Sequence, residues 1–224
     1  STSGFRSFSP PLRRFLAATV VNMIGSAALF GFALIYLHEV RGIPLGQAGF
    51  AQGSMNLVVV VLTPVAGSFS DRFGPRRVLG IGCLVSIVAG LSYMVVDSFL
   101  EAWLVAMLLG LGNALWFPSQ AALLAVIVEP SERPALSAFQ RAALNLGAAL
   151  GGVLGGFVVH AETLRSYQVL FVINAATYVV FLAVLPGLPS GRIAQTPSAP
   201  GFSRVLADGF FMRLLVTDLS IALG

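Results

Sequence analysis

Six apolar runs, each long enough to cross a lipid bilayer, restrict most strongly how this chain can fold. A helix of about 20 apolar residues spans a hydrocarbon core of about 30 Å. Inside lipid a helix satisfies its own backbone hydrogen bonds, whereas an open sheet cannot. We therefore predict an all-α membrane protein with six transmembrane helices. The runs fall at residues 15–37, 50–69, 78–96, 102–128, 135–159 and 168–188.

The arginines predict how these helices are oriented. Charged residues make up only 10% of the chain, whereas a soluble domain carries about 25%. All basic residues are arginine, and most lie in short connections between the apolar runs, so membrane topology explains the net charge of +4 better than nucleic-acid binding does. We expect a cytoplasmic N-terminus, which puts ten arginines inside and leaves Arg41 and Arg165 outside. The ten are Arg6, Arg13, Arg14, Arg72, Arg76, Arg77, Arg133, Arg192, Arg204 and Arg213.

Residues 67–77, between the second and third runs, form the most informative segment, which we call the signature segment. Its glycines suit a close helix contact and a tight reversal, the latter at the Gly74-Pro75 pair. Its arginines suit an anionic cytoplasmic membrane surface. The acid is not needed for topology. The pattern consists of Gly67, Asp71, Arg72, Gly74, Arg76 and Arg77.

This pattern resembles the signature loop of the major facilitator superfamily. The resemblance implies a transporter of twelve helices in two halves, with the substrate bound between the halves near the membrane midplane. It also implies that the acid and arginines form a conformational latch at the cytoplasmic ends of the two halves. The chain would then comprise an N-terminal six-helix bundle (1–188), a cytoplasmic linker with a short interfacial helix (189–209) and the truncated start of helix seven (210–224).

The fifth run carries two neighbouring stripes of small residues. Gly147, Gly151 and Gly155 recur every four residues on one stripe, and Gly152 and Gly156 lie on the next. Such stripes let helices approach closely, and packing alone explains most of the pattern. The segment also resembles the motif that marks exporters in the superfamily, with Gly152 in place of the usual proline. Together with the signature segment it most resembles the macrolide, drug and siderophore efflux branch.

Polar and aromatic residues within the runs are candidates for a substrate cavity. Each has a simpler explanation, namely a hydrogen bond that holds two helices together. Taken together, they suit an amphipathic cavity for a bulky, weakly polar ligand. The candidates are Asn22, Gln52, Asn56, Asn113, Trp116, Gln120, Asn145 and Tyr178.

Two charged residues are candidates for proton coupling. Asp218 lies about two turns into the expected seventh helix, where an unpaired carboxylate costs about 2.5 to 3.5 kcal/mol on insertion scales. Arg141 is the cation within the fifth run and a possible partner for it. The alternatives are that Asp218 stays hydrated near the cytoplasmic end and that Arg141 extends to the interface.

These features predict a secondary active transporter in the cytoplasmic membrane, which exports small hydrophobic compounds (a drug, antibiotic or siderophore-like metabolite) by proton-coupled alternating access. Its expected partners are the lipid bilayer, the substrate, the proton and the C-terminal half of the transporter. We predict no enzymatic activity, cofactor or metal, because two histidines and one cysteine form no catalytic or metal-spaced cluster. Three alternatives remain open: a lipid or lysolipid flippase, an uptake carrier of the same fold, or a non-transporting truncated membrane partner.

Overall fold

Six long helices make up the fold. The computed structural model describes residues 8–159 and 164–188, and these contain no strand. Each of the six helical segments is long and apolar enough to cross a membrane, which confirms the prediction from the apolar runs. The helices are α1 (Pro10–Ile35), α2 (Leu45–Phe73), α3 (Pro75–Ser92), α4 (Phe99–Ile127), α5 (Arg133–Val159) and α6 (Leu164–Val184), with short helical turns η2 (Tyr36–Val40), η3 (Tyr93–Val95), η4 (Pro130–Glu132) and η5 (Leu185–Gly187).

Local sequence explains where several helices begin and end. Helices α1 and α3 begin with a proline, whose missing N–H costs nothing in the first turn. Helix α4 begins with a capping box, in which Ser98 and Glu101 each accept a hydrogen bond from the other's backbone N–H. Helix α2 ends at Gly74, whose φ of +90° is a conformation that side chains with a Cβ rarely adopt.

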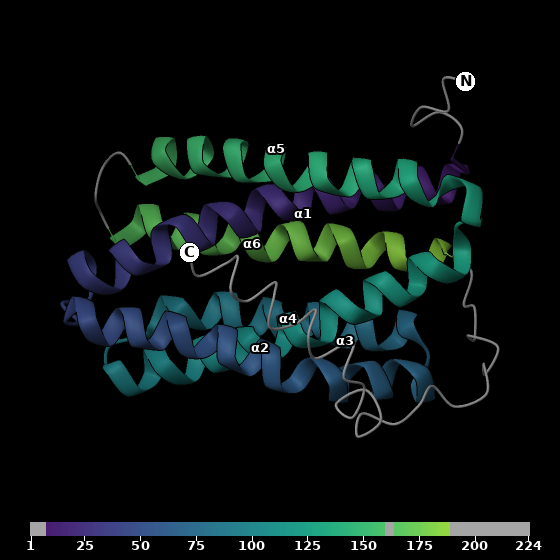
Figure 1. The fold of residues 1–224 in the computed structure, drawn as a ribbon. Coiled ribbons are helices and arrows are strands. Elements are labelled where there is room, and N and C mark those ends of the chain that lie inside the picture. The colour runs from purple at the N-terminus through teal and green to yellow at the C-terminus, as the bar shows by residue number, and fades with distance from the viewer. Residues whose placement is uncertain (1–7, 160–163, 189–224) are drawn as a thin grey trace, which may run out of the picture. The chain divides into compact units, whose positions relative to one another are not determined.

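The helices form two groups of three. Helix α4 packs against α2 and α3, while α1 packs against α5 and α6, and α3 and α6 join the two groups. Figure 1 shows these groups one above the other, with the helices running roughly along a common direction. Because successive helices alternate in direction, α1 begins at the same end of the bundle at which α2 stops and α3 begins.

Two aromatic clusters fill the bundle, one towards each end. At one end the Tyr36 hydroxyl donates a hydrogen bond of 2.9 Å to the Tyr93 carbonyl oxygen. At the other end the rings of Phe15 and Phe181 have centroids 5.0 Å apart beside Trp116. Buried polar residues lie between these clusters, such as Asn22 and Asn174, and also nearer the helix ends, such as Ser70 and Ser166.

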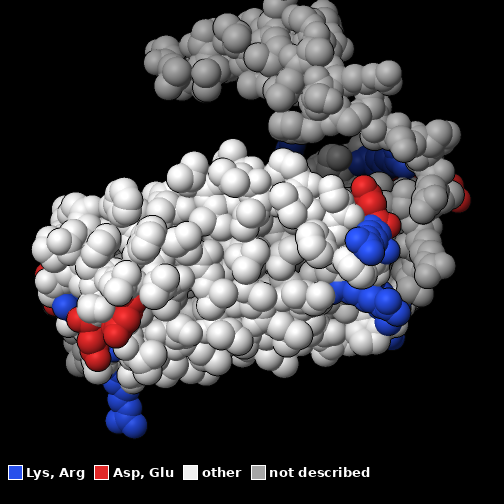
Figure 2. All heavy atoms as spheres, turned by 90° about the horizontal axis from the view of Figure 1, so that it is seen from below, with Lys and Arg blue, Asp and Glu red and all other residues white. Residues whose placement is uncertain are grey.

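Apart from Arg141 in the third turn of α5, the charged residues that the structure describes lie near the two ends of the bundle. Figure 2 shows arginine and acidic side chains at both ends of the visible face, separated by a band without charge. Large apolar side chains such as Val60 and Phe157 are more than two-thirds exposed. This is the surface of a multi-pass membrane protein, with lipid around the band and water at the ends. We call the end at which α1 begins the arginine-rich end; its described arginines are Arg13, Arg14, Arg72, Arg76, Arg77 and Arg133.

Candidate functional site

A cavity of about 420 Å³ lies among α1, α2, α4, α5 and α6. Its lining residues come from near the middle of these helices, for example Met55 in α2 and Asn113 in α4. Because each helix is long enough to cross a membrane, the cavity lies near the bilayer midplane. We call it the central cavity. It is lined by Met23, Ser26, Ala27, Phe30, Met55, Asn56, Val59, Asn113, Trp116, Phe117, Leu144, Ala148 and Tyr178.

The wall of the central cavity is mainly apolar, with a few polar groups. Asn56 and Asn113 contribute side-chain amides from α2 and α4. The Trp116 ring lies edge-on to the Tyr178 ring, with 6.0 Å between centroids. The buried Trp116 Nε1–H has no hydrogen-bond partner among the residues described. An apolar pocket with a few polar groups suits a bulky, weakly polar ligand.

Two of the predicted cavity residues lie behind this wall. Asn22 is buried and its Nδ2 lies 3.5 Å from Thr177 Oγ1 on α6. Gln120 is also buried, and its Nε2 donates to Thr19 Oγ1 over 3.3 Å. Both amides therefore link helices, which is the simpler of the two explanations that the sequence offered.

Two further candidates, Gln52 and Asn145, do not line this cavity, and their part in a substrate site remains a prediction. Gln52 is half-buried on α2 and Asn145 is exposed on α5, and neither lines the central cavity. An amide in a transmembrane helix avoids lipid, but its presence does not say which protein surface it faces. Asn56, Asn113, Trp116 and Tyr178 do line the cavity.

Sequence reasoning missed the apolar part of the wall. Met23 and Met55 line the cavity from α1 and α2, and Leu144 and Ala148 line it from α5. Methionine has a flexible, polarizable side chain that adapts to ligands of different shape. Nothing in a run of apolar residues separates those that face a cavity from those that face lipid.

The signature segment is helical instead of the loop we expected. Helix α2 continues to Phe73, and only Gly74 separates it from α3. The tight reversal at Gly74 is present, as its positive φ shows. Gly67 differs from our expectation, because a Cβ added there would have nothing within 4 Å. Its small surface is therefore not used by the described part of the chain.

The charged residues of the signature segment differ in what they contact. Arg76 Nη1 donates a hydrogen bond of 2.9 Å to the Leu188 carbonyl oxygen, which ties α3 to the end of the six-helix bundle. The Arg72 guanidinium carbon lies 5.4 Å from the centroid of the Phe73 ring. Asp71 and Arg77 are exposed, and neither forms an ion pair within residues 8–159 and 164–188.

The glycines of α5 separate into a packed stripe and an open stripe. A Cβ at Gly147 would lie 2.5 Å from Met23 Cβ, and one at Gly151 would lie 2.6 Å from the Ile24 carbonyl oxygen. Gly155 meets the Phe32 ring in the same way. Glycine at these three positions therefore allows α1 and α5 to pack closely.

The second stripe is different. At Gly152 and Gly156 an added Cβ would have nothing within 4 Å. The two stripes, which look alike in the sequence, thus face different surroundings.

The two residues predicted for proton coupling are not brought together in the described structure. Arg141 is exposed on α5, in the third turn of the helix. Asp218 lies outside the described residues. Their pairing remains a prediction.

The opposite end of the bundle holds a contact that the sequence analysis did not identify. Arg41 follows η2, and its Nε donates to the Tyr36 hydroxyl over 2.6 Å. Its Nη2 donates to the Met94 carbonyl oxygen over 2.6 Å, and its Nη1 forms an ion pair with Asp97. One side chain therefore links the end of α1 to the segment between α3 and α4.

Comparison with known proteins agrees with this architecture. The sequence model of the Major Facilitator Superfamily matches residues 15–224. A protein of Aeromonas salmonicida named multidrug resistance protein MdtH is 27% identical over 208 residues, which cover 91% of this chain and 51% of that protein. The proteins of the same name from Aeromonas hydrophila and Klebsiella pneumoniae are 29% and 25% identical, over 91% and 90% of this chain. The chain spans about half the length of these curated relatives.

Proposed function

Because this chain belongs to the Major Facilitator Superfamily, we propose that it forms the N-terminal half of a cytoplasmic-membrane exporter of small hydrophobic compounds. Its substrates would be drugs, antibiotics or siderophore-like metabolites. The family consists of transporters and not of enzymes. The relatives named multidrug resistance proteins support this choice of substrate class.

The central cavity is the observation that carries the proposal. It lies at the middle of the membrane-spanning helices and is large enough for part of a small molecule, since ligand sites measure about 300 to 1,000 Å³. In transporters built from two repeats, the substrate binds near the midplane at the interface of the repeats. The C-terminal half, supplied by the rest of the transporter, would complete the opposite wall.

The signature segment supports alternating access. Gly67 and Asp71 lie on one face of α2, four residues apart, and within the described bundle neither has a close partner. A carboxylate at a helix end is well placed for charge-assisted hydrogen bonds to the other half, which would form in one state and break in the other. In this proposal Asp71 forms the latch, and Arg76 anchors it to the end of α6.

Export and proton coupling complete the proposal. The direction rests on the resemblance of the α5 glycines to the exporter motif, and the packed stripe against α1 gives that motif a structural role. Asp218 remains our candidate proton carrier, with Arg141 as its partner in one state. The arginine-rich end, and with it the N-terminus and the linker, would face the cytoplasm.

Substitutions at Asn113 test the central cavity. Asn113→Leu keeps the branched shape of the side chain but removes the amide from the cavity wall, whereas Asn113→Gln retains an amide. We expect the first to lower efflux of weakly polar substrates by roughly tenfold, the size of one lost hydrogen bond, and the second to restore part of it. Gln52→Leu removes an amide outside the cavity and serves as the control. Equal efflux by Asn113→Leu and Gln52→Leu would contradict a substrate site here.

A further inference from the structure

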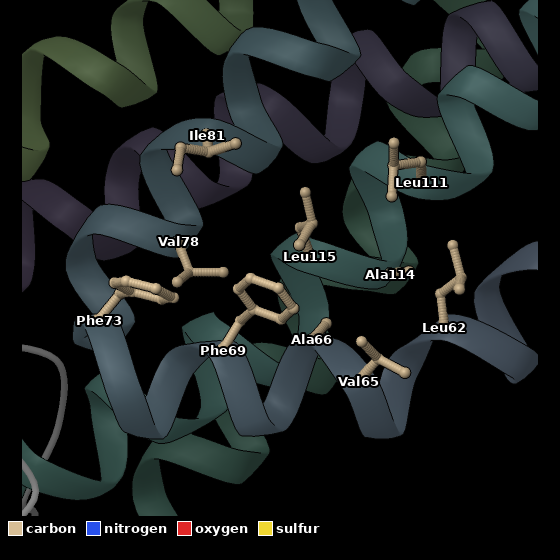
Figure 3. A pocket seen from close by; sticks show the side chains of 10 residues that line it. All are labelled: Leu62, Val65, Ala66, Phe69, Phe73, Val78, Ile81, Leu111, Ala114 and Leu115. Carbon is tan, nitrogen blue, oxygen red and sulfur yellow. The ribbon is translucent and has the colours of Figure 1, made fainter.

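A second hollow lies on the outer surface of the bundle, between α2 and α3, with α4 as its floor. Its volume is about 460 Å³. Figure 3 shows Phe69 and Phe73 of α2 near Val78 of α3 at one end, and Leu62 near Leu111 of α4 at the other. All the residues that line it are apolar. We call this hollow the lateral groove.

The length of the lateral groove matches the depth of one membrane leaflet. Its α2 wall extends from Leu62 to Phe73, about 16 Å along a helix that rises about 1.5 Å per residue. One leaflet contributes about half of the 30 Å hydrocarbon core. Phe73 is the last residue of α2, at the arginine-rich end. The groove therefore runs from the membrane surface at that end towards the midplane.

The lateral groove lies on the side of α2 that faces away from the proposed latch. Successive helix residues are turned by about 100°, so Leu62, Ala66, Phe69 and Phe73 share one face. On the same geometry Gly67 and Asp71 fall on the opposite face. If that opposite face meets the C-terminal half, the groove faces lipid.

Two arginines flank the membrane-surface end of the groove. Arg72 lies with its guanidinium over the ring of Phe73, which itself lines the groove. Arg77 is exposed and directly precedes Val78, another lining residue. Neither forms an ion pair within the part of the chain that the structure describes, and the neighbouring Asp71 lies on another face of α2.

We propose that the lateral groove binds one acyl chain of an anionic phospholipid from the leaflet at the arginine-rich end. The acyl chain of the lipid lies along Phe69, Ala66 and Leu115. The side chains of Arg72 and Arg77 bind the phosphate and the headgroup. Three features of the groove match such a lipid. Its lining is apolar, its length is about the depth of one leaflet, and the arginines at its membrane-surface end carry positive charge. The proposal does not depend on which substrate the transporter moves.

Photo-crosslinking tests this site in the complete natural chain, purified and placed in phosphatidylcholine vesicles. The probe is phosphatidylglycerol with a photoreactive group midway along one acyl chain, and the comparison probe is phosphatidylcholine with the same chain. We expect phosphatidylglycerol to label residues 62–81 and 111–115 about tenfold more than phosphatidylcholine does, the order expected of two arginines near the membrane surface. Labelling is read as modified peptides by mass spectrometry.

Two pairs of variants separate the acyl-chain contact from the headgroup contact. Val65→Trp fills the groove from an exposed lining position, and we expect it to abolish labelling by both lipids. Leu84→Trp adds the same ring to an exposed position of α3 outside the groove and should change nothing. The double variant Arg72→Gln/Arg77→Gln should keep the labelling but lose the preference for phosphatidylglycerol, whereas Arg133→Gln, at the same end, should preserve it.

Each alternative has its own outcome. If a protein segment covers the groove, neither probe labels it in the unmodified protein, and the proposal is wrong. Equal labelling by the two lipids reduces the groove to an ordinary lipid-facing surface and also overturns the proposal. Should Val65→Trp and Leu84→Trp lose labelling equally, the acyl chain is not in the groove.

Discussion

At the scale of single residues, some residues of the signature segment stabilise the six-helix bundle, and Asp71 does not. Arg76 satisfies the Leu188 carbonyl oxygen, and Gly74 provides the positive φ that the turn into α3 requires. Asp71 does neither, since its exposed side chain forms no ion pair in the described structure. A side chain that does not stabilise the bundle is free to form a contact that exists in only one conformational state of the transporter.

Asp71→Asn should lower transport by at least an order of magnitude without lowering membrane abundance or thermal stability. In the proposed latch, the carboxylate stabilises one state of the transporter through charge-assisted hydrogen bonds, each worth about 1.5 to 3 kcal/mol, and it forms no ion pair within the described bundle. Efflux kinetics and a thermal melt of the purified complete chain measure the two effects. Unchanged efflux would reduce the residue to a topological role, whereas a lower melting temperature would indicate a structural one.

Substitution of Arg41, in contrast to that of Asp71, should lower the stability of the protein. Arg41→Gln removes donors from the Tyr36 hydroxyl and the Met94 carbonyl oxygen, so we expect a loss of about 1 to 3 kcal/mol in stability. Asp97→Asn removes only the exposed ion pair, which is worth about 0 to 1 kcal/mol. Thermal unfolding in detergent compares the two variants. Equal losses would mean that the ion pair, and not the buried hydrogen bonds, holds α1 to α3.

At the scale of helices, hydropathy predicted the six transmembrane segments of the described residues but not where each one ends. The apolar run of the second helix stops near Phe69, yet α2 continues to Phe73. Backbone hydrogen bonds extend a helix beyond the lipid until a residue such as Gly74 ends it. The sequence therefore predicted a loop where α2 has about one more turn of helix.

The same scale explains why half of the glycine pattern was interpreted correctly. Repetition every four residues predicts a smooth stripe but does not identify what the stripe faces. Gly151 packs on the backbone of α1, whereas Gly152 has open space around it. The neighbouring helix decides this, and the sequence of α5 alone does not contain that information.

This difference gives a matched pair of substitutions. Gly151→Leu should separate α1 from α5 and cost at least the 1 to 3 kcal/mol typical of overpacking, because a Cβ there would lie 2.6 Å from the Ile24 carbonyl oxygen. Gly152→Leu, one residue away, should leave thermal stability nearly unchanged. Melting temperatures of the purified complete chain provide the comparison. Similar melting temperatures for the two variants would show that α1 and α5 do not pack as described.

At the scale of the whole molecule, the fold could be predicted from the sequence because a chain inside lipid must satisfy its own backbone hydrogen bonds, which favours helices. The central cavity followed only in part. Asn56, Asn113, Trp116 and Tyr178 were identifiable because polar groups in apolar helices avoid lipid. The apolar wall was not, since an apolar residue suits lipid and a hydrophobic ligand equally well.

The orientation in the membrane is testable with single cysteines, because the natural Cys83 is buried. Cysteine introduced at Ser190, in the expected cytoplasmic linker, should resist an impermeant thiol reagent in intact cells. Cysteine introduced at Glu162, in the sequence between α5 and α6, should react. The reverse labelling pattern would invert the topology and place the signature segment outside.

Transport by membrane vesicles tests the central claim most directly. Inside-out vesicles that contain the complete natural chain are supplied with a fluorescent hydrophobic dye and an inward-acidic proton gradient. The account predicts that dye accumulates above the level of vesicles without the protein, that a protonophore abolishes the accumulation, and that Asn113→Leu lowers it more than Gln52→Leu does. Accumulation equal to that of vesicles without the protein, or accumulation only in right-side-out vesicles, would contradict proton-driven export.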